Sequence, residues 1–185
     1  MTQAKILLHI CCAPCSTHAI LELKKDFTIQ GFFFNPNMFP PVEYKLRLAE
    51  TQNYLNMLGI DLHVPEYQRS EWLATVSHLR NESEGGKRCG LCYSHRLQQT
   101  AETAQKLGIP FFTTTLTVGP AKPAAVVFPI ARDIAAQTGV TFVAQDFKKK
   151  DGFKNSCRMS RTLGMYRQTY CGCEYSLLDR KNRFR

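Results

Sequence analysis

The stretch KILLHICCAPCS, residues 5–16, joins an apolar run to three cysteines that fall within five positions. The run KILLHI at 5–10 is typical of a strand buried on both faces of a sheet. A protein core uses a single cysteine as a small apolar side chain. Three thiols directly after a strand need another explanation, and a disulfide, a metal site and a redox centre are the candidates.

The length and composition of the chain restrict these candidates. A chain of 185 residues is long enough to bury a full core as one domain, so its eight cysteines are not needed to hold a small scaffold together. The opening MTQAKILLHI does not read as a secretory signal, and no apolar run approaches the roughly 18 residues of a membrane helix. We therefore expect a cytoplasmic protein without a membrane segment, in which clustered cysteines bind metal or act in catalysis.

The positive charge is concentrated near the C-terminus. The chain carries a net charge of +9, and residues 145–185 hold eleven Lys and Arg against four Asp and Glu. A polyanion such as RNA is the natural partner of such a surface. An ordinary solvated basic surface explains the same composition.

Apolar runs that favour strands alternate with segments of helical period. Strands are predicted over residues 5–10, 27–34, 61–67, 111–116 and 140–147. Helices are predicted from a cap at Ser16, over 41–58, around 72–79, after the loop at 84–88 and over 124–138. This alternation predicts an α/β fold with a mainly parallel sheet and helices on both faces. In such sheets ligands bind beyond the carboxyl ends of the strands.

The remaining cysteines form two further groups. Cys89 and Cys92 are three residues apart where a helix begins, so both thiolates can point to one side. Zinc sites, iron–sulfur clusters and dithiol centres all use this spacing. A second thiol group at a strand end favours a site with four thiolates, and structural zinc stays an alternative.

Cys171 and Cys173 lie too close in sequence for an ordinary structural disulfide. They suit an easily reduced disulfide, a redox relay or extra metal ligands. Cys157 has no partner at a telling spacing and is interpreted as a plain buried cysteine.

Seven segments, in this order along the chain, resemble the epoxyqueuosine reductase family QueH. The segments are LLHICCAPCS at 7–16, FFFNPN at 32–37, EYKLR at 43–47, GKRCGLCYSHRL at 86–97, TTTL at 113–116, DFKKKDG at 146–152 and YRQTYCGC at 166–173. Each segment alone is weak, but the ordered set that ends in YCGC is a specific signature.

The resemblance implies a single reductase domain over residues 1–185, of the adenine-nucleotide-hydrolase-like (HUP) α/β fold, with a cysteine-containing C-terminal extension. It also implies an iron–sulfur enzyme that reduces the epoxide of epoxyqueuosine in tRNA to an alkene, the last step of queuosine formation. Cys11, Cys12, Cys89 and Cys92 would hold a 4Fe–4S cluster. Cys15 would be a ligand of a second, mononuclear iron, and Cys171 and Cys173 would form a redox-active pair.

The resemblance also suggests which side chains handle protons and substrate. Asp146 and Tyr44 are candidate proton sources, with substrate binding or a structural role as the alternatives. Candidate substrate-binding residues are Asn35, Asn37, Arg47, Lys148, Lys149 and Arg167. The partners would be a tRNA with epoxyqueuosine at the anticodon wobble position and an external electron donor. His9, inside a buried strand, is interpreted as a satisfied core histidine.

The chemistry agrees with this reading. Removal of an epoxide oxygen takes two electrons, which is the number that a cysteine pair stores, whereas a cluster moves one at a time. A tRNA-thiolating enzyme of the ATP pyrophosphatase type is one alternative, but it needs an SGGxDS-like phosphate loop where this chain has CCAPCS. A metal-dependent tRNA-binding protein without catalytic activity is the other.

Overall fold

The computed structural model describes residues 3–183 of the chain, so residues 1–2 and 184–185 of the expected single domain lie outside the described residues. Its centre is one sheet of five parallel strands in the order β3-β2-β1-β4-β5. The strands are β1 (Ala4–His9), β2 (Phe27–Phe32), β3 (Leu62–His63), β4 (Phe111–Thr114) and β5 (Thr141–Phe142). The predicted parallel sheet is thereby confirmed.

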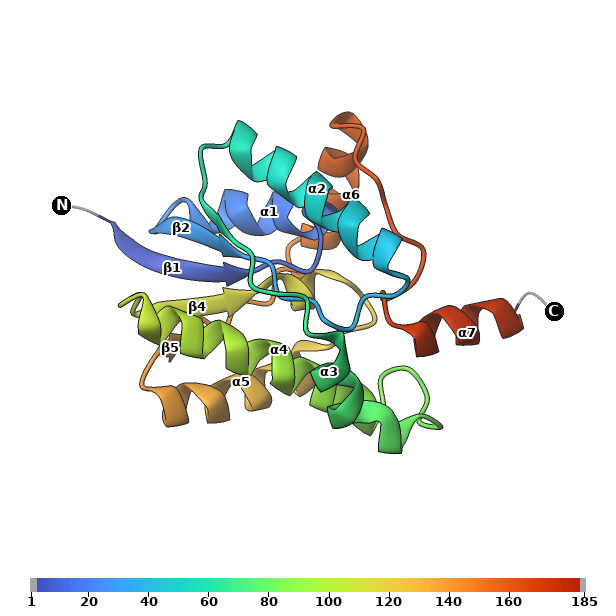
Figure 1. Cartoon of the computed structure of the whole chain (residues 1–185). Coiled ribbons are helices and arrows are strands. Elements are labelled where there is room, and N and C mark those ends of the chain that lie inside the picture. Colours follow the sequence, from blue (N-terminus) through green and yellow to red (C-terminus); the bar gives the residue numbers. More distant parts are fainter. Residues whose placement is uncertain (1–2, 184–185) are drawn as a thin grey trace.

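Helices cover both faces of this sheet (Figure 1). They are α1 (Ala13–Leu23), α2 (Pro41–Met57), α3 (Arg69–Val76), α4 (Lys87–Lys106), α5 (Ala124–Thr138), α6 (Gly152–Thr162) and α7 (Glu174–Arg183), with short 3-10 helices η1 (Ser77–Leu79) and η2 (Thr115–Val118). Helices α1, α2 and α6 lie on one face, while α4 and α5 lie on the other. None of the helices in residues 3–183 combines the length and the apolar character needed to cross a bilayer.

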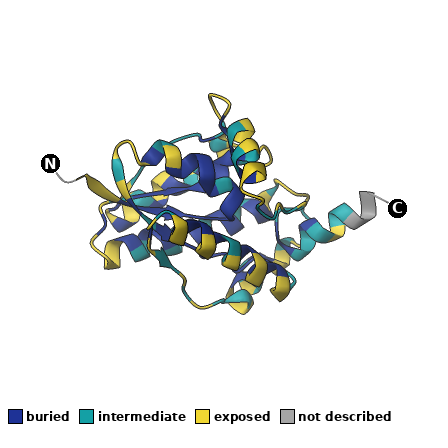
Figure 2. Cartoon of the chain, turned by 90° about the horizontal axis from the view of Figure 1, so that it is seen from above, coloured by how far each residue is buried: buried dark blue, intermediate teal, exposed yellow. Residues whose placement is uncertain are grey.

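The sequence of β1 explains why both faces are covered. Ile6 and Leu8 pack into the cluster on the α1 side, whereas Leu7 between them packs into the cluster on the α4 side. Successive side chains of a strand point to opposite faces, so a continuous apolar run requires a layer on each. Figure 2 shows the result, with buried residues inside and exposed ones on the outer sides of the helices.

Helix α1 begins three residues earlier than the predicted cap at Ser16. Cys12 is extended, with φ −173° and ψ 158°, and Pro14 lies in the first turn of the helix, where proline is well tolerated. The Ser16 hydroxyl instead donates to the carbonyl of Ala13, at 2.8 Å, inside the helix. The correction places Cys15 in the first turn of α1 rather than in a loop.

The strand order changes direction between β1 and β4, and ligands of open parallel sheets bind at such a point. Side chains join the two strand ends here: His9 Nδ1 and Thr114 Oγ1 are 2.8 Å apart, and His9 Nε2 lies 3.2 Å from the carbonyl oxygen of Phe34. Burial, followed by the charge of Arg96, lowers the pKa of His9 to about 3. His9 is therefore a neutral and satisfied core histidine, as predicted.

Candidate metal and redox centre

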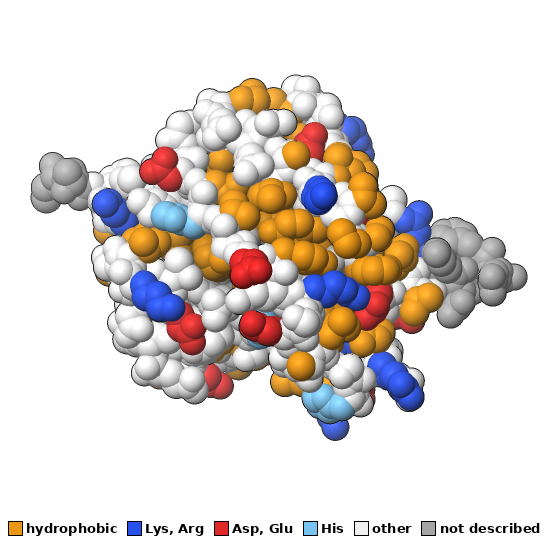
Figure 3. Space-filling model, viewed as in Figure 1, with side chains coloured by type: hydrophobic (Ala, Val, Ile, Leu, Met, Phe, Trp, Pro, Cys, Tyr) orange, Lys and Arg blue, Asp and Glu red, His pale blue; other side chains and the backbone are white. Residues whose placement is uncertain are grey.

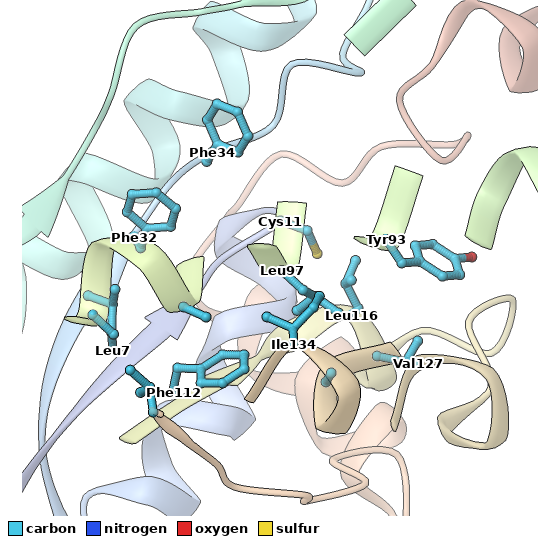
Figure 4. Packing of buried hydrophobic residues seen from close by; sticks show 14 of the residues in the cluster. Leu7, Cys11, Phe32, Phe34, Tyr93, Leu97, Phe112, Leu116, Val127 and Ile134 are labelled. Atoms are coloured by element: carbon cyan, nitrogen blue, oxygen red, sulfur yellow. The ribbon is translucent and has the colours of Figure 1, made fainter. Parts of the chain in front are cut away.

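Three cysteines gather where β1 ends and α1 begins. The sulfurs of Cys11, Cys12 and Cys15 all lie within 4.8 Å of one another, and residues 3–183 contain no other group of three or more Cys, His, Asp or Glu at such spacing. Cys11 and Cys12 are buried, and Cys15 is half-buried. In Figure 4, Cys11 lies beside the packed side chains of Leu97 and Leu116. Soft thiolates at this spacing suit zinc, copper or iron–sulfur centres.

Neighbouring donors favour negative charge on these sulfurs. The Thr115 hydroxyl donates to Cys11 Sγ at 3.3 Å and also accepts the Cys11 amide at 3.0 Å. Gln168 Nε2 donates to Cys12 Sγ at 3.0 Å. Hydrogen bonds from the Cys12 and Cys15 thiols hold the pKa of Cys11 well below its usual value, while the pKa of Cys12 rises to about 12 because its thiol donates to Cys11. Cys11 is thus the most acidic of the three thiols, since the pKa values of Cys12 and Cys15 are raised.

The second pair, Cys89 and Cys92, lies in the first turns of α4, as predicted. Cys89 shares the apolar cluster of Cys11 and Cys12, and its sulfur accepts the amide of Gly85 at 3.2 Å. Cys92 packs instead with Trp72, Val76 and Cys173. Both cysteines lie outside the group formed by Cys11, Cys12 and Cys15.

The third group, Cys171 and Cys173, lies directly before α7. Its two sulfurs are free thiols, as are those of the other six cysteines. Cys173 is buried and its sulfur accepts the amide of Ser176 at 3.4 Å, whereas Cys171 is half-buried. Burial, then the charge of Cys171, raises the pKa of Cys173 to about 12. The two thiols therefore differ, with one facing the interior and the other partly open.

A cavity of about 550 Å³ connects two of the three cysteine groups. Cys11 and Cys15 line it from the strand end, and Cys171 lines it from the C-terminal segment. Basic side chains make up much of the rest of its charged lining: Arg47, Arg96, Lys122, Arg167 and Arg180. A pocket of this size accommodates a small organic ligand, and its charge favours an anionic one.

Arg96 and Lys122 were not among the candidate residues from the sequence. Arg96 is 2% exposed and donates through Nη1 to Asn35 at 3.3 Å and through Nε to the Cys92 carbonyl at 3.3 Å. Its Nη2 atom has no partner. The negative charge of Cys171, then those of Cys11 and Cys15, outweighs burial and raises the pKa of Lys122. A Gly-Pro-Ala-Lys turn far from any cysteine motif offers no signal for this role.

Arg47, a candidate substrate-binding residue, is committed to the protein itself. It is 2% exposed and its Nε donates to Glu43 at 2.7 Å. Its two terminal nitrogens donate to the carbonyls of Cys171, at 3.1 Å, and Tyr170, at 3.4 Å. Gly172 has φ +126°, and a Cβ there would lie 3.1 Å from Arg47. Arg47 therefore clamps the backbone of the C-terminal cysteines, and glycine lets that backbone approach.

The other candidates occupy varied positions. Tyr44 packs on Tyr67, with ring centroids 4.3 Å apart, and Asp146 accepts the amide of Lys148 at 3.2 Å; neither lines the cavity. Asn35 donates to the Ile10 carbonyl at 2.9 Å and is buried, as is Asn37.

The candidate basic residues also differ in position. Lys149 is exposed and Lys148 is half-buried on the loop before α6. Arg167 lines the cavity and donates to Ser160 at 2.7 Å and to Cys157 Sγ at 3.1 Å. Cys157 is thus half-buried beside an arginine, and the prediction of a plain buried cysteine was wrong.

Solved structures with this fold include two tRNA-modification proteins. A predicted subunit of tRNA methyltransferase from Methanocaldococcus jannaschii has a TM-score of 0.60 at 11% identity, covering 83% of this chain and 74% of that one. The U34-tRNA thiolase NcsA from Methanococcus maripaludis, solved with its 4Fe–4S cluster, has a TM-score of 0.62 at 9% identity, covering 95% of this chain and 62% of that one. These likenesses concern the fold alone and confirm the predicted fold class.

Sequence comparison is more specific. A protein of Thermotoga maritima named epoxyqueuosine reductase QueH is 35% identical over 181 residues, which cover 96% of this chain and 93% of that protein. Proteins of the same name from Streptococcus pyogenes and Haemophilus influenzae are 34% and 35% identical, covering 94% and 95% of this chain and 71% and 72% of theirs. The profile of the family described as epoxyqueuosine reductase QueH matches residues 6–179. The chain therefore belongs to the epoxyqueuosine reductase QueH family, as its sequence motifs predicted.

Proposed function

We propose that this protein reduces epoxyqueuosine to queuosine in tRNA. The reaction converts the epoxide, two electrons and two protons into an alkene and water. One observation carries the proposal: Cys11 and Cys15 from the strand end and Cys171 from the C-terminal segment line the same cavity, together with several basic side chains. The chain also matches the reductase family from residue 6 to residue 179.

The cysteines fit an iron–sulfur cofactor by their chemistry. Cys11, Cys12, Cys89 and Cys92 would hold a 4Fe–4S cluster, and Cys15 would be a ligand of an additional iron. The shared apolar cluster of Cys11, Cys12 and Cys89 supports this set, as do the hydrogen bonds from Thr115 and Gln168 to the sulfurs. When bound, such a cluster transfers single electrons at a potential set by its surroundings.

The cysteines before α7 would supply the electron pair. Oxidation of the Cys171 and Cys173 thiols to a disulfide releases two electrons and two protons, which matches the reaction. An external dithiol would then reduce the disulfide by exchange. Cys171 is the accessible sulfur of the two, because it lines the cavity while Cys173 is buried.

The tRNA would present a single base to the cavity. Proteins recognise bases in single-stranded loops by splaying them out of the stack, and the anticodon wobble position lies in such a loop. The loop with Lys148 and Lys149 would contact phosphates from its exposed position. On the face in Figure 3, Lys, Arg, Asp and Glu are scattered around an apolar band, so this face has no concentrated positive charge for a phosphate backbone. We therefore assign the tRNA backbone to the basic loop before α6. A reduced, cytoplasmic setting follows from this substrate and these thiols.

The test is anaerobic incubation of the iron-loaded protein with tRNA that contains epoxyqueuosine and a low-potential reductant. We expect the modified nucleoside to lose the mass of one oxygen and to co-migrate with queuosine, without ATP. Omission of the reductant is the control and should leave the nucleoside unchanged.

The likeness to the tRNA thiolase NcsA makes thiolation the alternative outcome. ATP consumption together with a gain of sulfur would favour it. An intact cluster with neither change would exclude both activities and leave a metal-dependent tRNA-binding protein.

A further inference from the structure

We propose that Lys122 is a catalytic residue whose ammonium group donates a hydrogen bond to the oxygen that leaves the substrate. The inference rests on the proposed reductase function and adds a residue that no sequence motif indicated. It is carried by the position of Lys122 between two cysteine groups, by its lack of a partner and by the rigidity of its backbone.

Lys122 lies on the wall of the cavity that Cys11, Cys15 and Cys171 also line. The charge of Cys171, followed by those of Cys11 and Cys15, raises the pKa of Lys122 although burial lowers it. Cys11 and Cys15 belong to the strand end, whereas Cys171 belongs to the segment before α7. Lys122 and both cysteine groups therefore line one cavity, and a substrate must lie in this cavity to reach both groups.

The other basic groups of the cavity are engaged with the protein. Arg47 is bound to Glu43 and two carbonyls, and Arg167 is bound to Ser160 and Cys157. Among residues 3–180, whose side chains the structure describes, the Lys122 side chain has no hydrogen-bond or ion-pair partner. The buried Arg96 nearby also has one nitrogen, Nη2, without a partner. Lys122 and Arg96, which both line the cavity, thus have donors without a protein partner, and a ligand with an acceptor atom would satisfy the Lys122 ammonium.

The backbone of Lys122 is fixed by prolines. The segment Gly119–Lys122 closes a turn through the Lys122 amide, which donates to the Gly119 carbonyl at 3.3 Å. Pro120 lies within this turn, and Pro123 is the N-cap residue of α5 with φ −69°. A proline fixes its own φ and restricts the residue before it to extended conformations. The Cα atom of Lys122 is therefore held in place, and its flexible side chain extends from this fixed point.

The reaction needs a donor at this place. When a C–O bond of the epoxide breaks, the oxygen keeps negative charge until it has been protonated. A preorganised donor at a developing oxyanion accelerates a reaction by about 10²–10³-fold. Lys122 keeps its own proton in this role, and the two protons of the net reaction come from the thiol pair or from water. Tyr44 and Asp146, the candidates from the sequence, do not line the cavity.

The experiment compares three variants of the iron-loaded protein with the wild type. Lys122→Met removes the charge and keeps the length of the side chain, and Lys122→Arg keeps a donor. Lys106→Met makes the same chemical change on the exposed last turn of α4, at the opposite end of that helix from Cys89. For each protein we would measure iron content, the Kd for tRNA, the midpoint potential of the metal centre and the single-turnover rate after prior reduction.

We expect Lys122→Met to lower the single-turnover rate by about 10²–10³-fold, with iron content and the Kd for tRNA unchanged. Its midpoint potential should fall, because removal of a nearby positive charge disfavours electron uptake. Lys122→Arg should recover most of the rate, and Lys106→Met should match the wild type in all four measurements.

Three results would overturn the proposal. A weaker Kd with an unchanged rate would make Lys122 a phosphate contact, and loss of iron in Lys122→Met would make it a structural support of the metal centre. An unchanged rate in an active wild-type background would remove Lys122 from catalysis. An inactive wild type would instead refute the reductase function itself, so the two failures are distinguishable.

Discussion

The cysteines at the two ends of the chain are held in opposite ways. Cys11, Cys12 and Cys15 follow the central strand of the sheet, and a hydroxyl from the neighbouring strand end holds the first of them. Cys171 and Cys173 lie on an irregular segment that Arg47 and Ser176 hold from other elements. The sheet fixes the first group, whereas a few side chains and a backbone hydrogen bond from the Phe39 amide to the Gly172 carbonyl, at 2.8 Å, fix the second. A permanent metal site suits the first arrangement, and a pair that must change its bonding suits the second.

The largest expected effect comes from substitution of a proposed cluster ligand. Cys11→Ser or Cys89→Ser should remove most of the iron and the visible absorbance of the anaerobically purified protein, because each residue supplies one ligand of a minimal set. Iron and sulfide analysis measures the outcome. Cys157→Ser, outside the proposed ligand set, is the matched control and should keep its iron. Full iron content in the Cys11 and Cys89 variants would end the cluster assignment.

The second prediction separates the two groups. Replacement of both Cys171 and Cys173 by Ser should leave the absorbance spectrum intact and abolish multiple turnover with a dithiol reductant. The physical reason is that only a cysteine pair stores both electrons. Spectra and turnover would be measured on the same preparation. Loss of iron from this double variant would show that Cys171 and Cys173 are metal ligands, and the two cysteine groups would then not differ in function.

The third prediction tests the clamp on the second group. Arg47→Met leaves Glu43 buried without its cation, so the free energy of unfolding should fall by about 3 kcal/mol. Turnover should fall further than iron content, because the backbone of Cys171 is released while Cys11 keeps its hydrogen bonds. Arg158→Met, on an exposed face of α6, is the control in denaturant unfolding. Equal losses of iron and turnover would show that the two groups are not held separately.

The smallest expected effect lies outside both groups. Neutralisation of Lys148, Lys149 and Lys150 should weaken tRNA binding and reduce the log–log salt slope by about 0.7–0.9 for each phosphate that these lysines no longer neutralise. Titrations of binding against salt concentration would measure this slope. An unchanged slope would make these lysines ordinary solvated surface.

The sequence predicted the regular part of this arrangement well. Apolar runs placed the central strands, and motif spacing placed Cys89 and Cys92 at the start of a helix. The predicted strand at 140–147 is shorter in the structure, where β5 spans Thr141–Phe142. The last backbone hydrogen bond to β4 runs from the Val143 amide to the Phe112 carbonyl, at 2.9 Å, and the pairing stops there. Helix α6 escaped prediction because it packs on α1 through Gly152, Ser156 and Ser160 rather than an apolar stripe.

The site was predictable only where the type and spacing of the residues indicate their chemistry. Three sulfur motifs in one chain indicate metal and redox chemistry by residue type alone. Lys122, Arg96 and Arg47 acquire their positions through tertiary packing, and nothing in their neighbours in sequence separates them from other basic residues. Of these three, only Arg47 was a candidate, and its hydrogen bonds are with Glu43 and with the backbone of the cysteine segment.

The early start of helix α1 has a consequence for what its N-terminal end can bind. The positive end of a helix dipole after the first strand attracts an anion, and many nucleotide-binding proteins use it for phosphate. Here Cys12 occupies the N-cap position of that helix and Cys15 its first turn. A metal bound there would deprotonate these thiols, and the helix dipole would then favour their thiolate forms in place of phosphate oxygens. This helix end thus presents two sulfurs where such proteins hold a phosphate, after the central strand of an open parallel sheet.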